Sequence, residues 1–387
     1  MSQAGPAASR RGGDLPASAD VVVVGAGITG AAIAHHLARR GVSVVVIEQS
    51  PRPGAGATGR SGGMVRAYDP DPAFAELALP SLAAYRDPGR WASGQAPLHA
   101  VGAVTGADPA QEAALREAAG QINGALRASA HVVAGCDEVA GIRLAGGVAL
   151  VEPEAGWVAP AEVAADWLLQ ARADGAVVCY GVRVLGAEAR GGRPAVLTDA
   201  GVVSAGAVVA AVGPWAAQPA PGLRPASPVR SRSIQVSIVE RRPPAPPHAT
   251  FVDLRTGLYA KPVGPDRTLI GMPHLVWDSP FDSQPDPAHA RATVSALTAH
   301  FPWLTTAVHL STVRAADAYG PQGGGQAPGL LEGTGLPHVW SVRGWNGSGV
   351  KTAPEAGRRI ADACVADAFS DAAWIHYAYP LSTEGEQ

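Results

Sequence analysis

Residues 20–48 read DVVVVGAGITGAAIAHHLARRGVSVVVIE, and this stretch decides the fold. The run 20–24 is continuous and β-branched, which is typical of a strand buried on both faces of a sheet. A glycine turn follows, then 31–41 has helical spacing, and 42–48 is a second apolar run that ends on Glu48. Strand, glycine turn, helix, strand and acid in this order predict a dinucleotide-binding unit.

The glycines of the turn have separate roles in such a unit. Gly25 permits the tight turn, Gly27 lets a pyrophosphate approach the main chain, and Gly30 lets the helix pack closely on the strand. The helix start supplies amide donors and a positive dipole end for phosphates. Glu48 is expected to accept hydrogen bonds from the ribose hydroxyls. The residues predicted to line this part of the site are Gly25, Ala26, Gly27, Ile28, Thr29, Gly30, Glu48 and Gln49. The alternative is a purely structural glycine turn, and the motif alone does not distinguish NAD from FAD.

Composition narrows the classes of protein that fit. The chain has 387 residues and is 47% hydrophobic, which is enough for two domains or one large interwoven domain. The net charge is −3 and no basic block occurs, so neither nucleic acid nor an anionic membrane surface is an indicated partner. No run of about 18 uncharged apolar residues is found, so we expect no membrane span.

Cysteine usage and the N-terminus bear on location. Cys136, Cys179 and Cys364 are far apart and form no CxxC pair. This favours a reducing, cytoplasmic compartment and disfavours a disulfide framework or a cysteine-rich metal site, so no metal is predicted. Residues 1–19 are small, polar and rich in proline and glycine, with no apolar run after Arg10-Arg11. We expect a disordered tail and not an export signal.

Residues 49–68, QSPRPGAGATGRSGGMVRAY, place small residues before an apolar and basic patch. Together with the preceding motif, this stretch resembles the D-amino-acid oxidase superfamily of flavoproteins, and within it the glycine oxidase and monomeric sarcosine oxidase branch. In that family the segment runs beneath the flavin and helps to hold the pyrophosphate. The resemblance implies FAD as the cofactor, contacted here by Thr58, Ser61, Gly62, Gly63 and Met64.

Three later blocks extend the resemblance over most of residues 20–364. Residues 174–188 resemble the strand in which a valine main chain, here Val184, contacts adenine. Residues 205–216 resemble the strand-to-turn segment in which Gly213 and Trp215 lie close to the adenine half. Residues 338–364 resemble the closing strand, turn and helix, whose main chain reaches the flavin. The residues implied at this turn are Gly344, Asn346, Gly347, Gly349, Val350 and Lys351, and Ala353-Pro354 predicts that the helix starts there.

The blocks predict an α/β fold with two interleaved parts. A Rossmann-like FAD-binding domain would comprise 20–90, 155–216 and 315–376. A substrate domain, built on a mixed β-sheet with helices, would comprise 91–154 and 217–314. The substrate domain should contain strands within 227–242 and 257–274, with a turn at Gly264-Pro265-Asp266, and a helix should open at Pro160.

The resemblance assigns a carboxylate clamp to two basic residues. In the sarcosine oxidase branch an arginine and a closing-turn lysine grip the substrate carboxylate, and Arg66 and Lys351 match those positions. An arginine fork binds a carboxylate in a bidentate manner, and a lysine adds a point charge. The structural alternatives are an ion pair of Arg66 with Asp69, Asp71 or Glu76, and a solvated helix-start position for Lys351.

Other candidates for substrate contact are Tyr259 and His274 on the predicted strands, and Trp345, which would pack on the flavin or line the substrate pocket. A structural role for His274 is an equal alternative. His35 and His36, on the nucleotide helix, are interpreted as structural.

Two departures from the sarcosine oxidase branch affect the chemistry. No cysteine occurs in 312–325, where that branch attaches its flavin covalently, so FAD should be non-covalent. Leu269 stands at the place of a lysine that activates oxygen, and Lys261 and Arg267 do not align with it. The electron acceptor is therefore molecular oxygen or another acceptor.

These observations predict an FAD-dependent enzyme that oxidises a C–N bond of a small amino acid, with a secondary or cyclic one favoured, by hydride transfer to flavin N5. Oxygen is the favoured acceptor. The alternatives are a dehydrogenase that passes electrons to a quinone or partner subunit, and a non-catalytic FAD-binding subunit. The sequence leaves the oligomeric state open.

Overall fold

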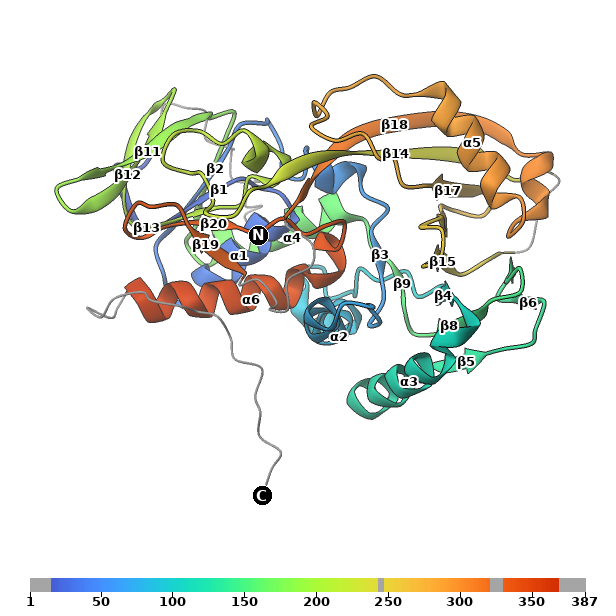
Figure 1. Ribbon diagram of the computed structural model, residues 1–387. Coiled ribbons are helices and arrows are strands. Elements are labelled where there is room, and N and C mark those ends of the chain that lie inside the picture. The colour runs from blue at the N-terminus through green and yellow to red at the C-terminus, as the bar shows by residue number, and fades with distance from the viewer. Residues whose placement is uncertain (1–14, 243–246, 321–329, 369–387) are drawn as a thin grey trace, which may run out of the picture.

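The computed structural model of the chain describes residues 15–242, 247–320 and 330–368. Two β-sheets stand side by side, each covered by helices (Figure 1). Residues 1–14 of the predicted tail and 369–376 of the predicted FAD-binding domain lie outside the described residues. The predicted tail is too long, since Ser18 and Ala19 already belong to the first strand and pair with Ser204 and Ala205.

The first sheet contains the dinucleotide-binding strands. Its order is β10-β2-β1-β13-β12-β11, and β20 pairs with β13 and β19. The neighbours β10, β2, β1, β13 and β20 run parallel, whereas β11, β12 and β19 pair antiparallel. The strands are β1 (Ser18–Val24), β2 (Val44–Glu48), β10 (Val177–Tyr180), β11 (Val184–Arg190), β12 (Arg193–Thr198), β13 (Gly201–Ala210), β19 (Leu331–Gly333) and β20 (Val339–Val342).

The central strands are valine-rich because both of their faces are buried. Residues 21–24 are at most 5% exposed and contribute to two separate apolar clusters, one on each side of the sheet. Three helices cover one face: α1 (Ile28–Ala38), α4 (Pro160–Ala173) and α6 (Gly349–Ala368), and Figure 1 shows α1 and α6 beneath the sheet. The helix α4 opens at Pro160, which confirms the prediction.

Helices α1 and α6 pack unusually close together because the contact is made by small residues. A β-carbon placed on Gly357 would lie 2.5 Å from the β-carbon of Ala32. Nearly every residue of α1 is buried, which fits its alanine-rich sequence. This packing fixes both helix starts relative to the sheet edge.

The second sheet is mixed, as predicted. Its order is β18-β14-β17-β16-β15-β4-β8-β5, with β15 and β4 parallel and the other neighbours antiparallel. Helices α3 (Glu112–Leu126) and α5 (Pro287–Leu297) flank it (Figure 1). The strands are β4 (Ala103–Ala107), β5 (His131–Val133), β8 (Val148–Glu152), β14 (Arg230–Glu240), β15 (Thr250–Asp253), β16 (Tyr259–Pro262), β17 (Arg267–Gly271) and β18 (Val308–Tyr319). The β16–β17 hairpin contains the predicted turn at 264–266.

Shorter elements join the two sheets. Helix α2 (Pro72–Arg86) packs on α6, and the strand pair β3 (Met64–Val65) and β9 (Gly156–Trp157) lies between the sheets. The remaining elements are β6 (Glu138–Val139), β7 (Ile142–Arg143) and the 3₁₀ turns η1 (Ala57–Arg60), η2 (Pro88–Arg90), η3 (Pro109–Gln111), η4 (Gly213–Ala217) and η5 (Pro302–Thr305). The predicted domain boundary at 314/315 falls inside β18, a strand of the second sheet.

The start of α6 differs from the prediction. The helix begins at Gly349, so Pro354 lies inside it and not at its first position. A proline here removes one main-chain donor, which frees the carbonyl four residues earlier. That carbonyl, of Val350, accepts a hydrogen bond of 2.7 Å from the Tyr85 hydroxyl, and Ser81 Oγ donates to Thr352 at 3.2 Å. Helix α2 thus replaces the lost intrahelical bond.

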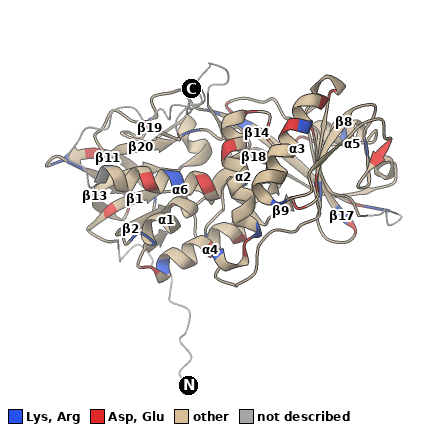
Figure 2. Cartoon of the chain, turned by 90° about the horizontal axis from the view of Figure 1, so that it is seen from below, with Lys and Arg blue, Asp and Glu red and all other residues tan. Residues whose placement is uncertain are grey.

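Charge is distributed without a dominant sign on the face that Figure 2 shows, where acidic and basic segments alternate along the visible helices. Within the described residues, no helix is long and apolar enough to cross a membrane. The three cysteines, all in the described part of the chain, form no disulfide.

Candidate active site

Two adjoining cavities lie at the carboxyl end of the parallel strands. The first has a volume of about 440 Å³ and reaches under the second sheet. The second has a volume of about 520 Å³ and lies over β1, β2 and η4. Both are lined by Gly27, Ala57, Thr58, Ala211 and Gly213. The shared lining makes one elongated site with a waist at the glycine turn.

The glycine turn has the geometry that the sequence predicts. Gly25 has φ of +103°, a conformation that a side chain disfavours. A β-carbon on Gly30 would lie 2.0 Å from the Gly25 carbonyl oxygen, so the helix can approach the turn only with glycine there. The N–H of Ile28 donates to Thr58 Oγ1 at 2.9 Å. The first turn of α1 therefore points at the waist, with Thr58 fixing its edge.

The segment after β2 forms one wall of the first cavity. Gly63 N–H donates to Ser61 Oγ at 3.1 Å, and Gly63 has φ of +64°. A β-carbon on Gly63 would lie 2.3 Å from the Val158 carbonyl oxygen, so this wall packs directly on the loop before α4. Thr58, Ser61, Gly62, Gly63 and Met64, all predicted from the sequence, line this cavity.

The second cavity collects the residues assigned to the adenine half. The Glu48 carboxylate accepts the N–H groups of Ala26 and Ser50, both at 2.8 Å, and is fixed at the end of β2. Gln49, Val184 and Trp215 line the same cavity, as do Gly25 and Gly213. The carboxylate oxygens keep acceptor capacity for further donors.

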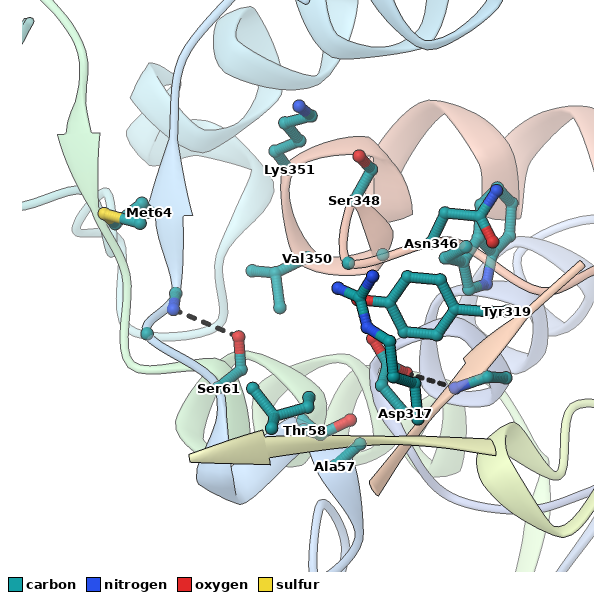
Figure 3. Close-up of a pocket in the computed structure, with 18 of the residues that line it drawn as sticks. Ala57, Thr58, Ser61, Met64, Asp317, Tyr319, Asn346, Ser348, Val350 and Lys351 are labelled. Carbon is teal, nitrogen blue, oxygen red and sulfur yellow. Dashed lines mark hydrogen bonds between the residues drawn. The ribbon is translucent and has the colours of Figure 1, made fainter. Parts of the chain in front are cut away.

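The closing turn faces the wall 58–64 across the first cavity. In Figure 3, Asn346 and Ser348 lie on the opposite side of the cavity from Thr58 and Ser61. Asn346 Oδ1 accepts the N–H of Gly320 at 2.9 Å, and Asn346 N–H donates to Ala318 at 3.2 Å. The turn is therefore attached to the end of β18.

Together these features fit FAD. The site is elongated, the start of α1 faces its waist, and an acid ends β2 at its far cavity. Among the described residues that line the first cavity, five are arginine or lysine and two are acidic: Arg60, Arg66, Arg232, Arg343 and Lys351, against Asp69 and Asp317. An excess of cations suits a pyrophosphate together with a carboxylate.

Lys351 is not solvated, which removes that alternative. Its side chain is 6% exposed, and Nζ donates to Asp69 Oδ2. Figure 3 shows the side chain directed away from Asp317 and Tyr319. The pKa of Lys351 is lowered to about 8, chiefly by burial and then by Arg66, against the opposing effects of Asp69 and Glu152. Asp69, which the sequence analysis considered as a partner of Arg66, therefore forms its ion pair with Lys351.

Arg66 has no ion-pair or hydrogen-bond partner among the residues that the structure describes. Its Nε is fully buried and unpaired, and the side chain lines the first cavity. The chain after it is held by Glu152, which is 2% exposed and accepts the N–H groups of Ala67 at 2.7 Å and Tyr68 at 3.2 Å. Burial raises the pKa of Glu152, and Arg66 opposes this.

A further basic group in the cavity, besides Arg66 and Lys351, was not predicted from the sequence. Arg232, on β14, donates to the Tyr319 hydroxyl at 2.5 Å and lies 3.9 Å from the centre of that ring. It pairs across the strands with Asp317, whose pKa is raised by burial and lowered in part by Arg232. A signal existed, since the period of two puts Arg232 on the cavity side of β14 with Ile234 and Val236.

The three remaining candidates all line the first cavity, with different accessibility. His274 has its Nδ1 2.8 Å from Ser233 Oγ and its Nε2 3.7 Å from Asp286, so both ring nitrogens face protein groups. Burial is the main cause that lowers its pKa. The ring of Tyr259 packs over Gly271, and burial raises its pKa. Trp345 is 8% exposed and packs beside Gly349.

Lys261 and Leu269 are cross-strand neighbours on β16 and β17. The Lys261 side chain is 6% exposed, with Nζ 4.1 Å from the centre of the Trp157 ring, and burial lowers its pKa to about 8. Lys261 is therefore a buried cation beside Leu269, the residue that stands where the resemblance implies an oxygen-activating lysine. It does not line either cavity within the described residues.

Comparison with solved structures shows the same fold at low sequence identity. Glycine oxidase from Geobacillus kaustophilus matches with a TM-score of 0.74 and 22% identity, covering 91% of this chain and 95% of that one. L-proline dehydrogenase from P. horikoshii gives 0.75 and 22%, covering 90% and 93%. Iminodiacetate oxidase from Chelativorans sp. BNC1 gives 0.71 and 23%, covering 89% and 95%.

A curated relative matches only in part. The tRNA 5-methylaminomethyl-2-thiouridine biosynthesis bifunctional protein MnmC of Marinobacter nauticus is 49% identical over 61 residues, which cover 13% of this chain and 10% of that protein. This chain thus matches about a tenth of that relative's length.

The sequence profile of one family spans nearly all of the described fold. The profile of the DAO family, described as FAD dependent oxidoreductase, matches residues 20–363, from the first strand to the closing helix. The cavities, the glycine turn and the cationic lining agree with the cofactor of that family. The chain belongs to the DAO family of FAD-dependent oxidoreductases.

Proposed function

We propose that this flavoenzyme oxidises a C–N bond of an amino acid whose carboxylate binds to Arg66. The observation that carries the proposal is a guanidinium that lines the cavity with no partner among the described residues. The Nε of this guanidinium is buried without a hydrogen-bond partner, which is costly, and a carboxylate ligand would relieve that cost. An arginine also selects the planar, two-oxygen shape of a carboxylate.

The protein's part in the reaction would be binding and orientation. FAD, when bound, accepts a hydride from the carbon next to the amine nitrogen. Arg66 would anchor the substrate, while Trp345 and the ring of Tyr259 would limit its position in the cavity. The amine must reach the site neutral, and no catalytic base is required for hydride loss from a neutral amine. The two engaged nitrogens of His274 agree with a supporting role for that residue.

The substrate class we favour is a secondary or cyclic amino acid, with oxygen as the acceptor and FAD held without a covalent bond. The described lining of the first cavity contains no cysteine. The buried ammonium of Lys261, opposite Leu269, supplies a positive charge near the place that a lysine occupies in oxygen-using relatives. A dehydrogenase that feeds a quinone or partner subunit is the second candidate, and a non-catalytic FAD-binding subunit is the third.

The decisive experiment is a panel of amino acids added to the yellow protein without oxygen. One secondary or cyclic amino acid should bleach the flavin absorbance. Arg66→Met should keep the yellow colour and weaken the response at least about thirtyfold, because a charge-assisted, bidentate contact is lost. Arg66→Lys keeps the charge but not the fork, and should recover part of the response.

The other possible outcomes distinguish the alternative functions. Admission of air should restore the colour of a bleached oxidase at once and that of a dehydrogenase slowly. A yellow protein that no amino acid bleaches would contradict the proposed substrate class. A response that Arg66→Met leaves at full strength would remove Arg66 as the anchor.

A further inference from the structure

The contact between Lys351 and Asp69 bears on how the substrate is selected, an inference that rests on the proposed function. The two side chains are 6% and 7% exposed, so the pair is shielded from water. Asp69 Oδ2 accepts from Lys351, and Asp69 Oδ1 accepts the N–H of Asp71 at 2.9 Å. Both oxygens of the carboxylate are therefore held by the chain itself.

The two cations of the expected clamp differ in availability. Arg66 has no partner in the described part of the chain, whereas Lys351 already has a carboxylate. If Lys351 turned to a substrate, Asp69 would remain as a buried carboxylate without its cation. Breaking a buried pair in this way is strongly unfavourable. The substrate carboxylate would have to offset that loss before it gained anything from Lys351.

We propose that Asp69 is a specificity-determining residue that occupies Lys351, so that the substrate carboxylate binds through Arg66 and not through Lys351. Asp69 lines the same cavity as both cations but comes from the loop before α2. Of the two cations of the expected clamp, Arg66 is then the one left for the substrate, which suits a single carboxylate. The Lys351–Asp69 pair helps to shape the cavity wall but adds no net charge to it.

A double variant, Asp69→Asn/Lys351→Met, tests the proposal because it leaves the net charge of the cavity unchanged. The Lys351–Asp69 ion pair is neutral as a whole, and so are the two side chains that replace it. If Lys351 takes no part in binding, the double variant should bind a carboxylate about as well as the original protein. Asp69→Asn alone frees Lys351 and should tighten binding.

The probe is pyrrole-2-carboxylate, a planar cyclic carboxylate with no hydrogen to lose at the carbon that bears the carboxylate. It is titrated into the FAD-loaded protein at pH 6.5, followed by the visible spectrum and by calorimetry. Because Asp69 raises the pKa of Lys351, its removal lowers that pKa below about 8, and the lower pH keeps the freed lysine charged.

The expected dissociation constant of Asp69→Asn is at least about tenfold lower than that of the original protein, the worth of one charge-assisted contact. The double variant should lie within about threefold of the original protein, since the pair it replaces is neutral. A double variant that binds tenfold or more weakly would overturn the proposal, because it would show that Lys351 grips the carboxylate in the original protein. An Asp69→Asn protein that binds no tighter would also overturn it.

Failure of the proposed function gives a separate result. Arg66→Met would then leave the dissociation constant as it was, whatever the Asp69 variants do. If Asp69→Asn does not take up FAD, the double variant decides alone, because it leaves neither Asp69 nor Lys351 charged without its partner.

Discussion

Among single residues, Glu152 has an effect on the site without lining it. Its carboxylate accepts the two main-chain N–H groups that directly follow Arg66. Glu152→Gln keeps the size of the side chain but replaces one acceptor by a donor that would face an N–H group. We expect a loss of about 1–3 kcal/mol in the free energy of unfolding and weaker carboxylate binding, with FAD uptake retained.

The matched control for this prediction is Glu154→Gln, two residues further along the chain. Glu154 is partly exposed, and its carboxylate accepts hydrogen bonds from the N–H and the hydroxyl of Ser129. Urea unfolding and titration with pyrrole-2-carboxylate measure both effects. If Glu152→Gln and Glu154→Gln gave the same dissociation constant, Glu152 would not position Arg66.

The ion-pair partners of single residues could not be predicted from the sequence. Arg66 and Lys351 could be placed at one cavity from family resemblance, and the structure brings both to it. Their partners could not be predicted, because Asp69, Asp71 and Glu76 all follow Arg66 closely along the chain. Which acid meets which cation depends on how α2 and α6 pack. That packing is a tertiary property, and no local pattern encodes it.

At the scale of elements, the contact between the glycine turn and α1 determines whether the cofactor can bind. Gly30→Ala would place a β-carbon 2.0 Å from a carbonyl oxygen of the same turn, so the turn or the helix must move. We expect a loss of about 1–3 kcal/mol or more in stability, as for overpacked cores, and loss of FAD uptake. The flavin absorbance of the purified protein measures the second effect.

A second helical glycine provides the comparison. Gly124, in α3, would meet no atom within 4 Å if it carried a β-carbon. Gly124→Ala should therefore keep FAD and change stability by about 1 kcal/mol or less, in the stabilising direction, because alanine is the better helix former. Uptake of FAD by Gly30→Ala at the level of Gly124→Ala would contradict the close-packing argument.

Element types were more predictable than element ends. The continuous runs of valine in β1 and β2 and the helical spacing of α1 identify these elements without tertiary information. The start of α6 was misplaced because Pro354 looks like a first helical residue. The hydroxyl of Tyr85, 265 residues away from Val350, makes the earlier start possible. A hydrogen bond over such a separation leaves no trace in the local sequence.

For the whole molecule, buried neutral histidines connect stability to pH. His248 is 3% exposed, its Nδ1 donates to the Ala249 carbonyl at 2.7 Å, and its Nε2 accepts from Thr268 at 2.9 Å. Burial lowers its pKa from 6.5 to about 4. Burial also lowers the pKa of His35 to about 4. Both rings therefore stay neutral in the fold at pH values where the unfolded chain binds protons.

The sign of the effect follows from proton binding. Below pH 6.5 the unfolded state takes up a proton at His248 and the folded state does not, so acid favours unfolding. The stabilisation is complete above that pH and is lost as the pH falls towards 4. For His248 alone, the loss should be about 2 kcal/mol in the free energy of unfolding by pH 5.

Urea unfolding at pH 7.5 and at pH 5 tests this with one buried and one exposed position. His248→Gln can keep both hydrogen bonds, since an amide donates and accepts, but it cannot titrate. Its loss of stability between the two pH values should be about 2 kcal/mol smaller than that of the original protein. His131→Gln, at an exposed strand position, should retain the full loss. Because both variants replace a histidine by glutamine, an equal pH dependence in both would show that the acid sensitivity does not originate in the buried ring.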